Sequence, residues 1–393
     1  MNKIRVLFVS QAAGGVQRHM IGLASRIDRN RFVLTALCPP EDLVPGASRE
    51  KESFVEAFRR VGVTVYPLRM KREIRLISDA ISFVRLFRFL RKERFDIVHT
   101  FSSKAGFLGR IAARLAGVRV IVHTPQSFAF DRPAWMFPQV IMYVLLEAFA
   151  GLFCDRVLAV CEDEKSYAAA LGVVDRKKIE VITNTIEIAP RLAVFDAAAK
   201  RSELGIAPGD KIIAYVARLA AQKAPLDFIR AAEMVHREFP AVTFVLAGDG
   251  PLLERARGYV RARNEEGFIK IIGWRNDVRE LTALSDIFVL TSLWEVLPNH
   301  ALLDAMALGK AIVITDTFGA RELVVEGGNG FVVPKGRPAL LARALIKLLQ
   351  MDQAALAAMG TKSRAIFDAL PTLESTVREL EAVYERLLAL KKS

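Results

Sequence analysis

TSLWEVLPNHALLDAMALGKAIVITD, residues 291–316, predicts one repeat of a parallel α/β sheet. Asn299 is a helix-capping residue type, Pro298 suits a first helical position and Gly309 is a natural C-terminal stop, so a short helix is expected between them. The β-branched run Ala311–Thr315 then predicts a buried strand. A helix that leads directly into such a strand is typical of α/β folds.

One acidic residue, Glu295, lies on the loop just before this predicted helix. A helix N-terminus attracts anions, and a carboxylate accepts hydrogen bonds from hydroxyl groups. A phosphate and a sugar hydroxyl could therefore be held together at this point. On this stretch alone, an ordinary βα unit with a solvated acid is an equal alternative.

Strands alternate with helical patterns along the whole chain, which predicts doubly wound, mostly parallel sheets. A length of 393 residues favours two domains, and the pattern restarts at Lys211 after a connection over Glu187–Ala207. We expect domains at residues 1–188 and 189–371, with a helix over 372–393 that packs back across the body. The predicted strands are Ile4–Ser10, Val33–Cys38, Val63–Pro67, Asp96–Thr100, Val118–His123, Val157–Cys161, Ile179–Thr183, Lys211–Val216, Val242–Ala247, Ile269–Gly273, Ile287–Thr291 and Ala311–Thr315.

The net charge of +13 is concentrated in the N-terminal half, where Arg69–Phe95 is the most basic region. This surplus indicates an acidic partner, such as a phosphate-bearing substrate or an anionic membrane surface. The region reads as an amphipathic helix, which can lie on an anionic membrane or pack on the sheet with a solvated basic face. Nucleic acid is not expected, because aromatic residues are not interleaved with the basic ones and no binding motif appears.

The most apolar stretch, Ala134–Cys154, is interrupted by Pro138, Gln139 and Glu147, so a buried helix is expected there rather than a membrane span. No signal peptide is apparent at the N-terminus. The three cysteines and five histidines show no metal-ligand spacing, so neither a protein-held metal nor a cofactor is expected. The cysteine usage favours a reducing compartment.

Several turns between predicted strands and helices could meet a ligand. Gly14 and Gly15 lead into a helix, and His123 ends a strand, which is where ligands collect in open α/β sheets. Arg218 and Lys223 follow a strand closely enough to meet a diphosphate, although two solvated loop cations would look the same. Because no GxGxxG motif is present, a dinucleotide site is not expected.

Taken together, these motifs resemble the retaining glycosyltransferases of the GT-B fold, family 4. The resemblance covers nearly the whole chain and includes HTFSSKAG from residue 99, HTPQSF from residue 123, GDGP from residue 248 and the 291–316 stretch. It implies two Rossmann-like domains and a nucleotide-sugar donor held mainly by the second. The implied catalytic residues are His123, Arg218, Lys223 and Glu295, and the implied donor-binding residues are Gly14, Gly15, Gly248, Trp274, Arg275, Pro298, Asn299 and Asp304.

By this analogy each group has a role. Arg218 and Lys223 take the diphosphate, together with backbone near Gly15 and Asn299. His123 contacts the sugar near its 6-position, and Glu295 faces the sugar hydroxyls. Asp304 would bind the ribose of the donor, and Trp274 and Arg275 would lie near its base. Fixed cations can stabilise a leaving diphosphate without a metal.

The branch that it resembles builds exopolysaccharide and capsule, so we expect a cytoplasmic enzyme, peripheral on the inner membrane face, that transfers sugar to a glycan or polyprenyl-linked acceptor. Departures from the pattern favour an alternative, a catalytically weak relative with a regulatory role. Eight residues instead of seven separate Glu295 from Asp304, and Ala217 and Ala224 replace glycines. A nucleotide-sugar epimerase on the same fold is a third reading.

Overall fold

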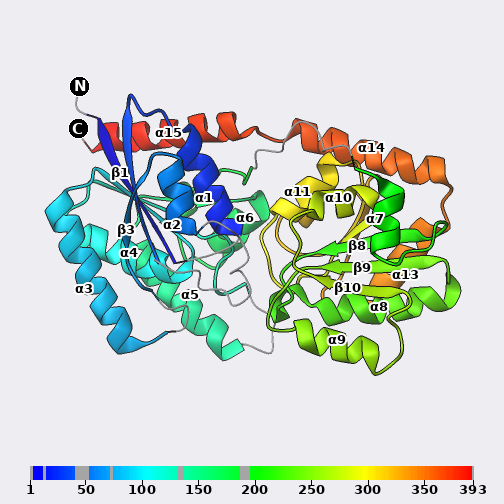
Figure 1. Ribbon diagram of the computed structural model, residues 1–393. Helices are drawn as coiled ribbons and strands as arrows, with labels where there is room; N and C mark the ends of the chain where they lie inside the picture. The colour runs from blue at the N-terminus through cyan, green and yellow to red at the C-terminus, as the bar shows by residue number, and fades with distance from the viewer. Residues whose placement is uncertain are drawn as a thin grey trace. The chain divides into compact units, whose positions relative to one another are not determined.

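The computed structural model describes residues 3–11, 15–39, 53–70, 74–131, 137–185 and 195–391. The chain divides into two compact units (Figure 1). The first consists of Met1–Glu187 together with Pro371–Ser393, and the second is Ile188–Leu370.

Unit 1 contains a parallel sheet that has seven strands in the described part of the chain, in the order β3-β2-β1-β4-β5-β6-β7. The order reverses direction beside β1, so the sheet is doubly wound, as the alternating pattern predicts. Its elements are β1 (Ile4–Ser10), α1 (Gly15–Arg26), β2 (Phe32–Cys38), α2 (Phe54–Arg60), β3 (Thr64–Pro67), α3 (Leu76–Glu93), β4 (Ile97–Phe101), α4 (Ser103–Leu115), β5 (Val120–Thr124), α5 (Phe137–Gly151), β6 (Arg156–Ala159), α6 (Glu162–Ala170), η3 (Arg176–Lys178), β7 (Ile179–Val181) and α15 (Leu373–Leu390).

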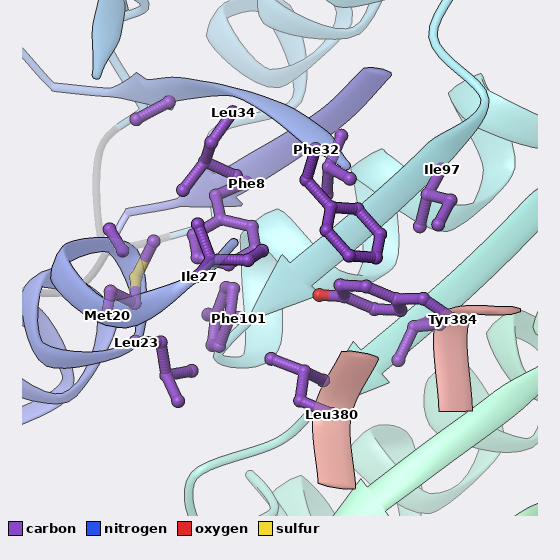
Figure 2. Packing of buried hydrophobic residues seen from close by; sticks show 14 of the residues in the cluster. Phe8, Met20, Leu23, Ile27, Phe32, Leu34, Ile97, Phe101, Leu380 and Tyr384 are labelled. Atoms are coloured by element: carbon purple, nitrogen blue, oxygen red, sulfur yellow. The ribbon is translucent and has the colours of Figure 1, made fainter. Parts of the chain in front are cut away.

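The two faces of this sheet bury different helices because strand residues alternate in direction. Val6 and Phe8 of β1 pack with α1, α2 and α15, and Leu7 and Val9 pack with α3 and α4. Figure 2 shows the first of these clusters, in which the Tyr384 side chain of α15 extends among the aromatic residues of the strands. The helix predicted at the C-terminus therefore forms, and it belongs to the core of unit 1.

Unit 2 repeats the plan with six described strands in the order β10-β9-β8-β11-β12-β13, all parallel. Here the order reverses between β8 and β11. Its elements are α7 (Ala197–Glu203), β8 (Lys211–Val216), η4 (Ala221–Lys223), α8 (Pro225–Glu238), β9 (Val242–Ala247), α9 (Leu253–Arg261), β10 (Ile269–Gly273), α10 (Val278–Leu284), β11 (Ile287–Leu290), α11 (His300–Ala307), β12 (Ala311–Thr315), α12 (Ala320–Leu323), β13 (Gly330–Val333), α13 (Pro338–Leu349) and α14 (Gln353–Ala369).

Three local predictions need correction. The expectation of a buried helix within Ala134–Cys154 is wrong, because α5 buries only Glu147, Ala150 and Gly151 among its residues. Pro298 is not the first helical residue, since α11 begins after its cap. The connection expected over Glu187–Ala207 contains helix α7 among its described residues.

Candidate active site at the carboxyl edge of unit 2

The strand order of unit 2 reverses between β8 and β11, and the loops that leave these two strands therefore diverge. Ligands bind in the crevice that this divergence opens beyond the carboxyl ends of parallel strands. The loop after β8 carries Arg218 and Lys223, and the loop after β11 carries Glu295. Residues 72 positions apart in the chain thus meet at the topological switch point.

Lys223 and Glu295 form an ion pair at this point, with the Lys223 ammonium donating to Glu295 Oε1. Their side chains are only 16% and 11% exposed, so the pair is shielded from water on most sides. The other carboxylate oxygen, Oε2, accepts a 2.6 Å hydrogen bond from the Ser292 hydroxyl. Glu295 is therefore held in one orientation by two donors, and an ammonium group has further protons to offer a ligand.

Side chains fasten the two loops to each other. The Tyr215 hydroxyl donates to the Lys223 carbonyl at 2.9 Å, and the Thr291 hydroxyl donates to the same oxygen at 2.8 Å. Gln222 donates to the Trp294 carbonyl at 2.9 Å. Burial raises the pKa of Tyr215 far above its usual value, so this hydroxyl keeps its proton. The positions of the two charged groups are fixed before any ligand arrives.

Asn299 caps helix α11 as the sequence predicts, because its Oδ1 accepts a 2.9 Å hydrogen bond from the Leu302 amide. Its Nδ2 is buried and has no hydrogen-bond partner among the described residues. Gly309 ends the helix with a φ of +64°, which suits glycine. The α11 N-terminus thus presents both its dipole and an unsatisfied amide donor.

Gly248 is a place where only glycine fits. Its φ is +149°, and a Cβ atom there would lie 1.9 Å from the Ala217 carbonyl oxygen. The adjoining loops are also joined by backbone, since the Leu219 amide donates to the Asp249 carbonyl at 2.9 Å. Gly248 therefore supports the loop that carries Arg218, which is half-buried.

Arg275 forms ion pairs with two acidic neighbours. Its guanidinium forks onto Asp277 with bonds of 2.7 and 2.6 Å and also reaches Glu203 at 2.6 Å. Lys200 joins the same group through a 2.6 Å contact with Asp277. The hydrogen bonds from Arg275 hold the pKa of Asp277 well below its usual range. Trp274, directly after β10, is half-buried.

Asp304 also has a cationic neighbour, because Arg279 Nε of α10 lies 3.1 Å from its Oδ1. This contact joins α10 to α11.

His123 lies in unit 1 and is fully buried. Its Nδ1 is 2.9 Å from the Thr100 hydroxyl and 3.2 Å from the Thr100 carbonyl, and its Nε2 has no hydrogen-bond partner in the described structure. Burial, followed by the Arg110 charge, lowers the pKa of His123 well below its usual value, so the ring is neutral. The strand extends one residue beyond the predicted end, so His123 is the penultimate residue of β5, and it faces the interior.

The remaining predicted residues of unit 1 are less accessible. His99, the first residue of the HTFSSKAG motif, is buried. Its Nδ1 lies 2.6 Å from the Tyr384 hydroxyl and its Nε2 lies 2.8 Å from the Thr124 hydroxyl. Gly14 lies outside the described residues. Gly15 begins α1, and a methyl group on it would meet nothing within 4 Å.

Sequence reasoning missed the residues that fix the site. Tyr215, Thr291 and Ser292 are ordinary strand-end residues by pattern, and their roles come from contacts across the two loops. The available signal in the sequence was the pair of hydroxyl residues, Thr291 and Ser292, that shortly precedes Glu295. No cluster of three or more potential metal ligands occurs among the described side chains.

Two family models match the chain. The one described as Glycosyl transferase 4-like domain matches residues 14–185, and the one described as Glycosyl transferases group 1 matches residues 196–365. The UDP-Gal:alpha-D-GlcNAc-diphosphoundecaprenol alpha-1,3-galactosyltransferase of Escherichia coli is 37% identical over 268 residues, which are 67% of this chain and 68% of that protein. The chain belongs to the group 1 glycosyltransferases.

Other relatives agree with this membership. A capsular polysaccharide biosynthesis glycosyltransferase of Staphylococcus aureus, CapM, is 23% identical over 81% of this chain and 84% of its own length. The crystal structure of Anabaena HepE in complex with UDP-glucose has a TM-score of 0.79, covering 98% of this chain and 100% of that one at 22% identity. This glycosyltransferase therefore has the GT-B fold, with two Rossmann-like domains, as the sequence motifs predict.

Proposed function

We propose that this glycosyltransferase moves a sugar from a nucleotide-diphosphate sugar to a lipid-linked or glycan acceptor, with retention of configuration, in surface polysaccharide synthesis. The observation that carries the proposal is the shielded Lys223–Glu295 pair at the switch point of unit 2. It offers a cation for a diphosphate beside a carboxylate for sugar hydroxyls, which are the two halves of such a donor.

The chemical step requires charge stabilisation above all. The bond between the anomeric carbon and the diphosphate oxygen breaks, and the electron pair stays on the nucleoside diphosphate. The acceptor oxygen then bonds to the same carbon and gives up its proton to the departing diphosphate. Lys223, Arg218, the α11 N-terminus and the Asn299 amide would stabilise the departing diphosphate without a protein-held metal.

The remaining donor contacts follow the resemblance. Gly14, Gly15 and Gly248 would let backbone approach the donor, and Asp304 would accept from the ribose. Since Arg279 holds Asp304 and acids hold Arg275, both groups are already oriented before the nucleotide binds. His123 would reach the sugar only after a movement that opens its buried position.

The acceptor proposal comes from the relatives. The Escherichia coli protein is named for a diphosphoundecaprenol-linked acceptor, and CapM for capsular polysaccharide. A lipid-linked acceptor requires work at a membrane surface, and the exposed cations of α3, Arg85, Arg88 and Lys92, suit anionic headgroups. We place this activity on the cytoplasmic face of the membrane.

Thermal shift with UDP, GDP and ADP sugars tests the donor. One of them should raise the melting temperature, and Arg218→Ala should abolish that rise. Glu295→Gln should lower transfer to a polyprenyl diphosphate sugar by on the order of 10²-fold while nucleotide binding persists. As a control, Glu254→Gln changes an exposed acid on α9 and should leave transfer unchanged.

One observation favours a second candidate, a catalytically weak regulator. Ala224 stands where glycine is expected and adopts a left-handed conformation, with a φ of +44°, next to Lys223. A nucleotide-sugar shift without any transfer, against a panel of lipid-linked acceptors, would favour this second function.

A further inference from the structure

Helix α5 has the reverse of the polarity expected in water. Its one charged residue, Glu147, is buried, and its two carboxylate oxygens accept hydrogen bonds of 2.7 and 2.9 Å from Arg110. Its large apolar side chains point outward instead, with Phe137 64% and Leu145 65% exposed. A surface helix of a water-soluble domain shows the opposite arrangement.

The exposed residues of α5 form one continuous ridge. Phe137, Ile141, Leu145 and Phe149 recur every four residues and so lie on one face of the helix, and Leu152 extends this face beyond its end. The ridge runs for about 20 Å, given a rise of about 1.5 Å per residue. An exposed apolar surface of this kind marks a place where something else binds.

The first turns of α3 combine exposed apolar groups with cations. Leu76 and Ile77 are 82% and 80% exposed. These apolar groups share a surface hollow with three arginines. The hollow is lined by Arg69, Arg75, Leu76, Ile77, Ser78, Ile81, Ser82 and Arg85. Apolar side chains among guanidinium groups suit the boundary between lipid headgroups and acyl chains.

Helices α3 and α5 lie in one layer with α4 between them, as Figure 1 shows. Lys104 of α4 donates to Asp79 of α3 at 2.8 Å, and Phe107 of α4 contacts Phe149 of α5 with ring centroids 6.4 Å apart. The cations of α3 and the ridge of α5 therefore border the same helical layer.

We propose that this layer docks on an anionic lipid bilayer, with the α5 ridge entering the acyl-chain boundary and the α3 arginines contacting headgroup phosphates. The inference rests on the proposed function, in which the acceptor is lipid-linked. A bilayer supplies both the apolar depth and the negative charge that the layer requires. A second copy of the chain would instead place the α3 cations of both molecules close together.

Vesicle sedimentation separates the two contributions. The full chain should bind phosphatidylglycerol vesicles better than phosphatidylcholine vesicles, and part of this binding should survive about 1 M salt, where charges are screened. Ile141→Gln with Leu145→Gln keeps the charge constant and should weaken binding by on the order of tenfold or more at both low and high salt. Arg85→Gln with Arg88→Gln should lower only the salt-sensitive part.

A matched control is Val325→Gln with Leu390→Gln, which changes residues 45% and 62% exposed outside this layer. It should bind vesicles like the unmodified chain. Equal binding by the α5 variant would overturn the inference, and so would a dimer of the unmodified chain that the α5 changes dissociate.

Thermal shift with the donor on the same proteins distinguishes this inference from the proposed function. A retained donor shift without vesicle binding would overturn membrane docking alone. Vesicle binding through α5 without any donor shift would support docking and remove the proposed donor site.

Discussion

Two residues of opposite charge, Lys223 and Glu295, are the centre of the proposed site. Without a partner, the largely buried Lys223 ammonium group would lose the favourable free energy of its hydration, and the ion pair with Glu295 offsets this loss while no ligand is bound. An incoming diphosphate can take over this role, because a second anion then satisfies the same ammonium group. The pair therefore keeps the cation in place without blocking it.

Ala224 carries the clearest local strain in the site. A left-handed conformation costs a residue with a Cβ atom on the order of 1 kcal/mol, while glycine adopts it freely. Ala224→Gly should therefore leave the free energy of unfolding unchanged or raise it by up to about 1 kcal/mol. Chemical denaturation measures the difference.

Ala357→Gly, at an exposed position of helix α14, is the control and should lower the free energy of unfolding by about 1 kcal/mol. An equal loss in both variants would mean that Ala224 is not strained.

At the scale of elements, α15 is fastened to the sheet of unit 1 by a buried polar contact. The Tyr384 hydroxyl oxygen lies 2.6 Å from His99 Nδ1, and the tautomer of His99 sets which of the two groups donates the hydrogen bond. Burial raises the pKa of the Tyr384 hydroxyl well above its usual value. Through this contact, His99, the middle residue of β4, is bound within the core of unit 1 instead of facing a ligand.

Tyr384→Phe keeps the ring but leaves His99 Nδ1 without this partner, so it should lower the free energy of unfolding by about 1–3 kcal/mol. Thermal or urea unfolding of the full chain checks this. Tyr259→Phe, whose ring stacks under Arg263 at the surface of unit 2, should change stability by less than about 0.5 kcal/mol. Similar losses from both changes would argue against the buried contact.

The elements were largely predictable, and the exceptions have physical reasons. Asn299 and Gly309 predicted where α11 begins and ends, because a helix cap depends on the residue types next to the helix terminus and not on distant contacts. The inward turn of His99 was not predictable, since its partner is 285 residues away. The outward ridge of α5 was not predictable either, because apolar content alone does not distinguish a core from an exposed face.

At the scale of the whole molecule, none of the helices in the described ranges is both long and apolar enough to cross a membrane. The three cysteines, Cys38, Cys154 and Cys161, are buried, and none of them forms a disulfide within the described part of the chain. Both sheets follow the same doubly wound plan, and the proposed diphosphate cations lie beside the switch point of the second.

Buried histidines make the stability of unit 1 depend on pH. Burial lowers the pKa of His19 to about 4 and those of His99 and His123 well below their usual value. These rings stay neutral when folded but take up protons near pH 6.5 when unfolded, so stability is lost as pH falls from about 6.5 toward 4. Glu164, whose pKa burial raises to about 7, and Glu379, whose pKa burial also raises, act in the opposite direction but are two groups against three.

Calorimetry should therefore show the melting temperature of unit 1 falling between about pH 6.5 and 5. His19→Leu should reduce this slope, since it removes one of the three histidines that take up a proton on unfolding. A melting temperature that is flat or rises on acidification would contradict the assignment of neutral buried histidines.

The most direct measurement is calorimetric titration of the nucleoside diphosphate identified by thermal shift into two variants and the unmodified chain. Lys223→Met should weaken its binding by at least about tenfold, a cost of about 1.4 kcal/mol. Lys347→Met, at an exposed lysine in the last turn of α13, should bind like the unmodified chain. Equal affinity in all three proteins would contradict a diphosphate site at Lys223.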